Sequence, residues 1–284
     1  MQHVTFPDGH SRPSLGLGTW KMGESARARS AEVAAVRLAL DLGYRVIDTA
    51  EMYGEGGSED VIGRAVADAL RAAALRREDL FVVSKVYPHN ASRRGLPAAC
   101  ERSLQRLRLD RIDLYLLHWP GSYPLAETLE AFEALRAQGR ISAWGVSNFD
   151  CDEMQELLAV PGGGACAANQ VYFSLGERGP GFELLPWLRE QRMPLMAYSP
   201  IDQGRLAGDA ALAAIARGLG VSAAQLALAW VLHQPGVMAI PKAVREAHLR
   251  ENLAAAELEL DADTVRAIDE RFPPPRRRTP LAMI

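Results

Sequence analysis

The sequence predicts one α/β domain over residues 1–284 with the architecture of a (β/α)8 barrel, also called a TIM barrel. Eight short apolar runs alternate with longer stretches whose apolar residues recur every three or four positions, as in strands and amphipathic helices. Strands that alternate with helices imply a parallel sheet. No change in composition and no linker divides the 284 residues, a length that suits a single closed barrel.

The elements follow in order along the chain. An N-terminal β-hairpin is predicted over residues 3–15, with its turn at Pro7, Asp8 and Gly9. The eight strands are predicted at residues 15–18, 45–49, 80–86, 112–118, 143–147, 167–171, 194–199 and 237–241. Helical patterns between them include residues 30–42, 96–107, 125–138 and 150–158. Two more helical segments, 207–219 and 222–233, separate the last two strands, so we expect extra helices beyond those of a bare barrel.

Composition narrows the classes of function. The chain is 48% hydrophobic, which is ample for a large core, and its net charge of −3 gives no reason to expect a nucleic-acid partner. No secretion signal starts the chain and no apolar run reaches about 18 residues, so we expect a cytoplasmic protein without membrane contact. Cys100, Cys151 and Cys166 are widely spaced without a CxxC motif, and we expect buried thiols that bind no metal.

Lysine is scarce, which draws attention to the positions that retain it. Lys21, Lys85 and Lys242 are the only lysines among 32 basic residues. Arginine evidently serves the ordinary surface roles, so the compact charge and adjustable pKa of lysine are candidates for function where lysine remains. All three lie at the carboxyl ends of predicted strands, the face on which a barrel gathers its active site.

Asp48, Lys85 and His118 each lie two residues after an apolar residue of their strand, so they are expected to point inward at the barrel rim. A buried Asp48 or Lys85 alone would cost several kcal/mol, so we expect the two to pair. A purely architectural salt bridge is the alternative interpretation. Tyr53 lies five residues beyond Asp48, in the loop that leaves the strand.

Together these four residues predict a general-acid site. Free tyrosine has a pKa of about 10 and is a poor proton donor at pH 7. A lysine ammonium about 4 Å away is expected to lower the pKa of Tyr53 by up to about three units, with Asp48 offsetting part of this effect. His118 would orient a carbonyl oxygen toward Tyr53, which would protonate it as the carbonyl becomes an alcohol. The other half of that reaction requires a hydride donor.

At these residues the sequence resembles the aldo-keto reductases, most of all bacterial members of the methylglyoxal-reductase type. The motifs that carry the resemblance occur in family order over nearly the whole chain: "LGLGTWK" (15–21), "GYRVIDTAEMYG" (43–54), "VSKV" (83–86), "DLYLLHWP" (113–120), "WGVSNF" (144–149), "NQVYF" (169–173), "AYSP" (197–200) and "IPKAVREAHLRENL" (240–253). Each motif is weak by itself, whereas the ordered set is highly specific.

The resemblance implies a monomeric enzyme without a metal that reduces small aldehydes and ketoaldehydes such as methylglyoxal. It implies a catalytic tetrad of Asp48, Tyr53, Lys85 and His118, with Tyr53 as the proton donor. The residues implied for binding NADPH are Gly18, Thr19, Trp20, Asp48, Ser147, Asn148, Gln170, Tyr198, Ser199, Pro200, Ile201, Ile240, Lys242, His248, Glu251 and Asn252. The residues implied for the substrate pocket are Trp20, Met52, Tyr53, Tyr87, His118 and Trp119.

Three features depart from the family pattern. His248 stands where members commonly carry an arginine for the 2′-phosphate, so NADPH is expected as cofactor with NADH possible. The segment 54–58 is longer than usual, and its glycines are expected to loop out before Glu59 starts a helix. The last residues, 271–284, include three consecutive prolines followed by three arginines, and we expect a short surface tail that leaves the pocket open.

Other classes of protein fit less well. A Rossmann-type reductase would need a GxGxxG after the first strand, which the sequence lacks. A metal-dependent hydrolase would need clustered histidines, but of six histidines only His118 ends a predicted strand. A barrel that binds NADPH and acts as a non-catalytic regulatory subunit stays open as the alternative, although the complete tetrad argues against it.

Overall fold

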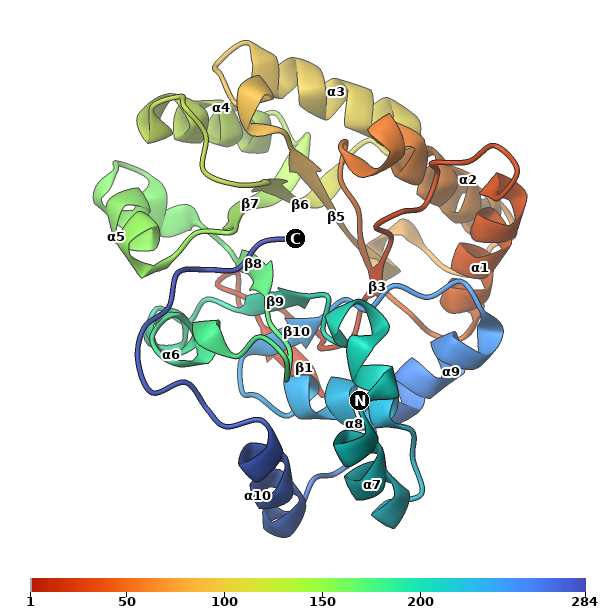
Figure 1. Ribbon diagram of the computed structural model, residues 1–284. Coiled ribbons are helices and arrows are strands. Elements are labelled where there is room, and N and C mark those ends of the chain that lie inside the picture. The colour runs from red at the N-terminus through yellow and green to blue at the C-terminus, as the bar shows by residue number, and fades with distance from the viewer. Residues whose placement is uncertain (1) are drawn as a thin grey trace.

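Eight parallel strands surround the centre of the computed structural model, which describes residues 2–284 (Figure 1). Residue 1 of the predicted domain lies outside the described residues. The strands are β3 (Leu17–Gly18), β4 (Val46–Asp48), β5 (Phe81–Val86), β6 (Ile112–Leu117), β7 (Ile141–Ser147), β8 (Asn169–Tyr172), β9 (Leu195–Tyr198) and β10 (Val237–Ala239). Each pairs in parallel with the next, and parallel bridges from Leu15 to Ala239 and from Gly18 to Lys242 join the last strand to the first. The predicted closed barrel is confirmed.

Helices surround the strands on the outside (Figure 1). They are α1 (Arg29–Asp41), α2 (Gly57–Arg71), α3 (Gly95–Leu107), α4 (Leu125–Ala137), α5 (Cys151–Ala159), α6 (Leu184–Glu190), α7 (Ala210–Gly218), α8 (Ala223–Leu232), α9 (Glu246–Ala255) and α10 (Ala262–Arg271). The short 3₁₀ helices are η1 (Tyr53–Gly56), η2 (Arg77–Asp79), η3 (Pro88–Asn90), η4 (Gly163–Ala165), η5 (Gly179–Gly181) and η6 (Asp202–Gly208). The extra helix between the last two strands is confirmed, but it starts at Ala210 because η6 occupies the residues before it.

The predicted alternation of inward and outward side chains holds. Val46, Val83 and Leu114 belong to the small apolar cluster inside the barrel, whereas Ile47 and Val82 belong to the larger cluster between the barrel and its helices. Because side chains alternate along a strand, the residues two positions beyond Val46 and Val83 also face inward. The chain therefore places Asp48 and Lys85 inside the barrel, at its carboxyl rim.

The predicted hairpin closes the opposite end of the barrel. Strands β1 (His3–Thr5) and β2 (Ser11–Pro13) pair antiparallel. Phe6, in the turn between them, is 4% exposed and packs against Phe81 with ring centroids 5.2 Å apart. The barrel is thus filled by apolar side chains below its carboxyl rim.

No single helix in residues 2–284 is long and apolar enough to cross a membrane. Helices α7 and α8 pass such a test only as a pair, with a bend of 80° between them.

The contact between α2 and α3 allows a direct test of the packing. A Cβ added to Gly63 of α2 would lie 2.1 Å from the carbonyl oxygen of Arg106, a backbone atom that cannot retreat easily. Alanine normally favours a helix over glycine by about 1 kcal/mol, but overpacking costs about 1–3 kcal/mol. We expect Gly63→Ala to lower the free energy of unfolding in urea by at least about 1 kcal/mol.

Gly218→Ala is the matched control, because a Cβ at this helical glycine would meet nothing within 4 Å. We expect this variant to be as stable as the parent or more stable. Equal effects of the two substitutions would contradict the described packing of α2 on α3.

Candidate active site

Four side chains from separate segments meet at the carboxyl rim. Lys85, on β5, is 0% exposed and its Nζ donates to both carboxylate oxygens of Asp48, at 2.9 and 2.8 Å. The same Nζ donates to the Thr49 carbonyl at 2.8 Å and lies 3.1 Å from the Tyr53 hydroxyl. His118 follows β6, and its ring meets the Tyr53 ring edge-on with centroids 5.8 Å apart. The structure therefore brings together all four residues predicted for the tetrad.

Burial and pairing oppose each other at the Asp48–Lys85 pair. Burial raises the pKa of Asp48, and it lowers the pKa of Lys85. The charge and hydrogen bonds of each partner counteract these shifts, and Gln170 also donates to Asp48 at 2.7 Å. Two carboxylate oxygens on one ammonium form the geometry of an ionised pair.

The structure reverses the expected direction for Tyr53. Burial of the hydroxyl, reinforced by the negative charge of Asp48, raises the pKa of Tyr53 well above 10. The expectation that Lys85 lowers this pKa is wrong for the site as described, because the carboxylate that holds Lys85 also repels a phenolate. The phenol accordingly keeps its proton at neutral pH, as a proton donor must.

His118 is neutral at physiological pH. Burial and the nearby charge of Lys85 lower the pKa of His118 well below 6.5. Its Nδ1 is buried without a hydrogen-bond partner in the described part of the chain. A neutral imidazole can donate one N–H to a carbonyl oxygen without adding a charge that would compete with Lys85.

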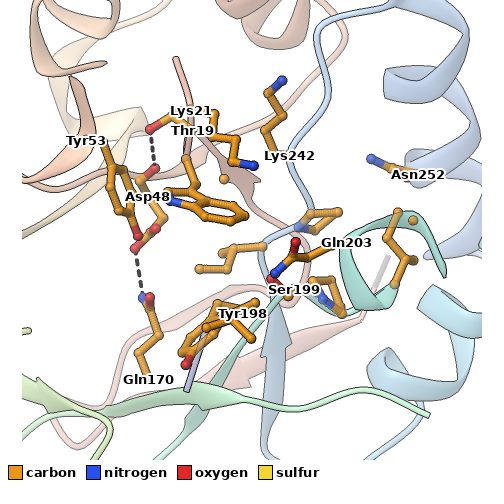
Figure 2. A pocket seen from close by; sticks show the side chains of 18 of the residues that line it. Thr19, Lys21, Asp48, Tyr53, Gln170, Tyr198, Ser199, Gln203, Lys242 and Asn252 are labelled. Carbon is orange, nitrogen blue, oxygen red and sulfur yellow. Dashed lines mark hydrogen bonds between the residues drawn. The ribbon is translucent and has the colours of Figure 1, made fainter. Parts of the chain in front are cut away.

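A cavity of about 780 Å³ opens from the tetrad along the rim (Figure 2). Asp48, Tyr53 and Gln170 lie on one side of this view, and Lys242 and Asn252 lie on the other. Every residue predicted to bind the cofactor lines this cavity, as do all those predicted for the substrate pocket except Tyr87. Lys85 is not in the lining, and it reaches the cavity only through its contact with the Tyr53 hydroxyl.

Tyr87 lies outside the lining and supports it from behind. Its ring packs edge-on against Trp119 with centroids 5.9 Å apart, and its hydroxyl donates to Glu55 at 3.0 Å. Tyr87, expected to form part of the pocket wall, instead supports Trp119, which lines the cavity.

Lys21, marked in the sequence as a scarce lysine at a strand end but given no binding role, lines the cavity, and sequence reasoning missed further residues of the lining: Gln203, Gly204, Ala207, Ser222, Ala224, Pro241, Met283 and Ile284. Backbone geometry marks part of this set. Lys21 and Gln203 have left-handed backbone angles, with φ of 64° and 52°, as do Asn148 and Ser199 in the predicted set, with φ of 62° and 47°. Non-glycine residues seldom adopt such angles, and they concentrate at functional sites.

The middle of the cavity suits a planar carboxamide next to a ring. Tyr198 donates to the Asn148 side chain at 2.9 Å, and Asn148 donates to the His118 carbonyl at 3.1 Å and to the Ser147 hydroxyl at 3.2 Å. Gln170 uses its amide nitrogen on Asp48, which leaves its amide oxygen as an acceptor. These fixed donors and acceptors, beside the face of Tyr198, are the chemistry that a nicotinamide group needs.

The C-terminal tail reaches this cavity, contrary to the expected open pocket. Residues 273–284 leave α10 and return across the barrel, so that the C-terminus lies over its mouth (Figure 1). Arg278 pairs with Asp150 and Asp152 at the start of α5, at 3.0 and 2.8 Å. The tail sequence alone does not predict these ion pairs, because Arg278 and its partners lie far apart in the sequence. The ion pairs bring Met283 and Ile284 into the lining.

The segment 54–58 is also not the expected looped-out turn. It forms η1 followed at once by α2, which starts at Gly57, two residues before the predicted start at Glu59. Its glycines pack tightly: a Cβ on Gly57 would lie 2.4 Å from the carbonyl oxygen of Gly23.

The barrel rim holds a protonated tyrosine between a buried lysine and a neutral histidine, beside a large cavity. These features define a class of enzyme that protonates a carbonyl oxygen. Residues 14–271 match the aldo/keto reductase family, and the chain belongs to that family. The resemblance that the motifs indicated is confirmed.

Known relatives support this assignment over the full length. The chain is 49% identical to methylglyoxal reductase YeaE of Escherichia coli K12 over 286 residues, which cover 99% of this chain and 98% of the relative. It is 37% identical to glyoxal reductase of Bacillus subtilis, with 95% of each chain covered. The crystal structure of an aldo-keto reductase from Klebsiella pneumoniae in complex with NADPH matches with a TM-score of 0.94 at 45% identity, over 100% of both chains.

The ion pair predicts a pH dependence. Asp48 raises the pKa of Lys85 against the lowering effect of burial. In Asp48→Asn the amine should lose its proton at lower pH, so we expect the alkaline limb of the kcat–pH profile to move to lower pH. We also expect kcat at pH 7 to fall at least about tenfold, since a neutral amine stabilises a phenolate less.

Asp113→Asn is the control, because Asp113 is 7% exposed and pairs with Arg77 at 2.7 Å, at the start of β6 away from the tetrad. Its profile should keep the parent's alkaline limb even if its stability falls. An unmoved limb in Asp48→Asn, or the same displacement in both variants, would refute the role given to the pair.

The tail predicts a change in selectivity. Arg278→Ala should release Met283 and Ile284 from the cavity wall. Because an apolar group in a pocket changes discrimination by about tenfold, we expect the kcat/KM ratio of a bulky aromatic aldehyde to a short aldehyde to rise by about that factor. Arg277→Ala removes the same charge from the exposed neighbouring residue and should leave the ratio unchanged. Unchanged ratios in both variants would show that the tail does not limit the pocket.

Proposed function

We propose that this enzyme reduces short aldehydes and 2-oxoaldehydes, methylglyoxal among them, to alcohols with NADPH. The observation that carries the proposal is the 3.1 Å contact between Lys85 Nζ and the Tyr53 hydroxyl at the cavity. A purely structural ion pair would need neither a tyrosine hydroxyl in contact with the lysine ammonium nor a neutral imidazole beside that tyrosine.

The proton chemistry follows from the described contacts. NADPH, when bound, supplies the hydride that goes to the carbonyl carbon. His118 hydrogen-bonds the carbonyl oxygen and aims it at Tyr53, whose hydroxyl donates the proton that completes the alcohol. Negative charge then develops on the Tyr53 oxygen, where the Lys85 ammonium stabilises it, and Asp48 keeps that ammonium in position.

The residues of the cavity fit the cofactor. Ser147, Asn148 and Gln170 would hold the carboxamide, and Tyr198 would lie against the nicotinamide ring. Lys242 supplies a cation in the cavity wall, and Asn252 lies farther from Tyr53 in the same view (Figure 2). His248 also lines the cavity, and we propose that Lys242 and His248 give NADPH preference over NADH, though a weaker preference than an arginine fork would give.

The proposed substrate class rests on the size and chemistry of the pocket end. Trp20, Met52 and Trp119 line the cavity together with Tyr53, as do Met283 and Ile284 of the tail. Apolar walls of this kind, with one donor pair at the tetrad, suit a small carbonyl compound. We propose further that residues 1–284 act as one domain and as a cytoplasmic monomer, which light scattering of the purified protein and fractionation of the source cells would check.

Replacement of Tyr53 by phenylalanine tests the proposal. Tyr53→Phe removes the proton donor and keeps the ring, so we expect kcat with methylglyoxal to fall by about 10²–10⁴-fold. NADPH affinity, measured by quenching of its fluorescence, should stay within about twofold of the parent, since a phenol contributes to the chemistry more than to binding.

A panel of carbonyl compounds separates the alternatives. Short 2-oxoaldehydes and aldehydes should be turned over better than a steroid ketone, with NADPH better than NADH. A parent protein that binds NADPH but reduces none of the panel would favour the regulatory-subunit alternative. Good turnover of the steroid beside poor turnover of methylglyoxal would overturn the proposed substrate class.

A further inference from the structure

Three buried hydroxyls form a ring behind the tetrad. Thr49 donates to Ser58 at 3.0 Å, Ser58 donates to Thr19 at 2.7 Å, and Thr19 donates to the Asp48 carbonyl at 2.8 Å. All three side chains are 0% exposed. Ser58 also lies 3.3 Å from the Thr19 carbonyl oxygen. Because Asp48 and Thr49 are consecutive, the chain of hydrogen bonds closes on itself through one peptide link.

The ring holds the two residues whose oxygen atoms Lys85 contacts. The Thr49 carbonyl accepts from Lys85 Nζ at 2.8 Å, while the carboxylate of Asp48 accepts from the same atom. The ring thus fixes both ends of the Asp48–Thr49 unit, whose oxygen atoms direct three of the ammonium's contacts. Each hydroxyl donates once in the same direction around the ring, an arrangement in which hydrogen bonds strengthen one another.

The glycines of segment 54–58 explain how Ser58 reaches this place. A Cβ on Gly23 would lie 2.0 Å from the Gly57 backbone, and a Cβ on Gly57 would lie 2.4 Å from the Gly23 carbonyl oxygen. Only two glycines allow the loop after β3 and the start of α2 to approach this closely. The approach inserts Ser58 between Thr19 and Thr49.

We propose that Ser58, together with Thr19 and Thr49, positions the Lys85 ammonium for proton transfer, and that the glycines of segment 54–58 serve to seat Ser58. The three are positioning residues: they hold the chain at Asp48 and Thr49, whose carboxylate and carbonyl oxygens contact Lys85, and Lys85 in turn acts on Tyr53. The groups that face Lys85 are Asp48 from β4, Tyr53 from η1, Glu59 from α2 and His118 after β6.

Two substitutions break the ring: Ser58→Ala removes both bonds of Ser58, and Thr49→Val removes the bond from Thr49 to Ser58. Ser58→Ala removes the central hydroxyl, and Thr49→Val removes the first one while keeping its shape. We expect each to lower kcat by about tenfold, within the range that small misplacements of catalytic groups produce. The double variant should have about the same kcat as the less active of the two single variants, because both substitutions interrupt the same hydrogen-bonded ring. Rates are divided by the concentration of NADPH-binding sites, so that unfolded protein does not count toward the enzyme concentration.

The pH profile distinguishes positioning from mere support of the fold. A Thr49 carbonyl that is free to turn away stabilises the ammonium less, so the alkaline limb of kcat should move to lower pH in both variants. A loss of stability alone would scale the rate equally at every pH. Thr49→Ser restores a hydroxyl at the same place and should recover most of the rate and the parent's limb.

Ser14→Ala is the matched control, since the Ser14 hydroxyl is 1% exposed and has no hydrogen-bond partner among residues 2–284. It should leave the rate and the profile unchanged. If Ser58→Ala does not fold, the Thr49→Val and Thr49→Ser pair decides alone. Rates within twofold of the parent in Thr49→Val, equal rates in the two Thr49 variants, or an unmoved limb would overturn the proposal.

Discussion

The buried pair of Asp48 and Lys85 is the interaction on which the rest of the site depends. Neither charge could stay buried alone, because desolvation of an unpaired ion costs several kcal/mol. Together they fill the barrel mouth with a fixed ammonium, 0% exposed, that also contacts the Thr49 carbonyl and the Tyr53 hydroxyl. The carboxylate that makes this possible also raises the pKa of Tyr53. The pair therefore keeps the phenol protonated at rest and leaves a cation in place for the charge that forms when the proton departs.

The barrel supplies the geometry that this pair requires. Parallel strands place Asp48 and Lys85 at the same rim, with apolar side chains packed beneath them inside the barrel. The hairpin covers the opposite end, and the cavity beside the tetrad opens at the rim, where a carbonyl compound can approach. Around the rim, left-handed residues such as Asn148 and Ser199 direct polar groups into the cavity, and the tail anchored by Arg278 narrows its mouth.

The sequence carried much of this account because its signals were local. Alternating apolar runs predicted the strands, and residue parity predicted that Asp48 and Lys85 face inward. Features set by distant contacts were not predictable in the same way. The return of the tail depends on ion pairs between Arg278 and α5, and the direction of the Tyr53 pKa depends on burial and on the distance to Asp48. The ring through Ser58 joins three segments, and its glycines, which from sequence alone indicate a loop, pack backbone against backbone.

The most direct measurement of the central claim is the protonation state of Lys85. With three lysines in the chain, lysine labelled with ¹⁵N at Nζ gives few enough signals to assign Lys85 by substitution. The account predicts an ammonium at pH 7 that loses its proton below the ordinary lysine pKa of 10.5, since burial lowers the pKa of Lys85 while Asp48 keeps it charged. A neutral amine at pH 7, or titration at or above the ordinary value, would contradict it.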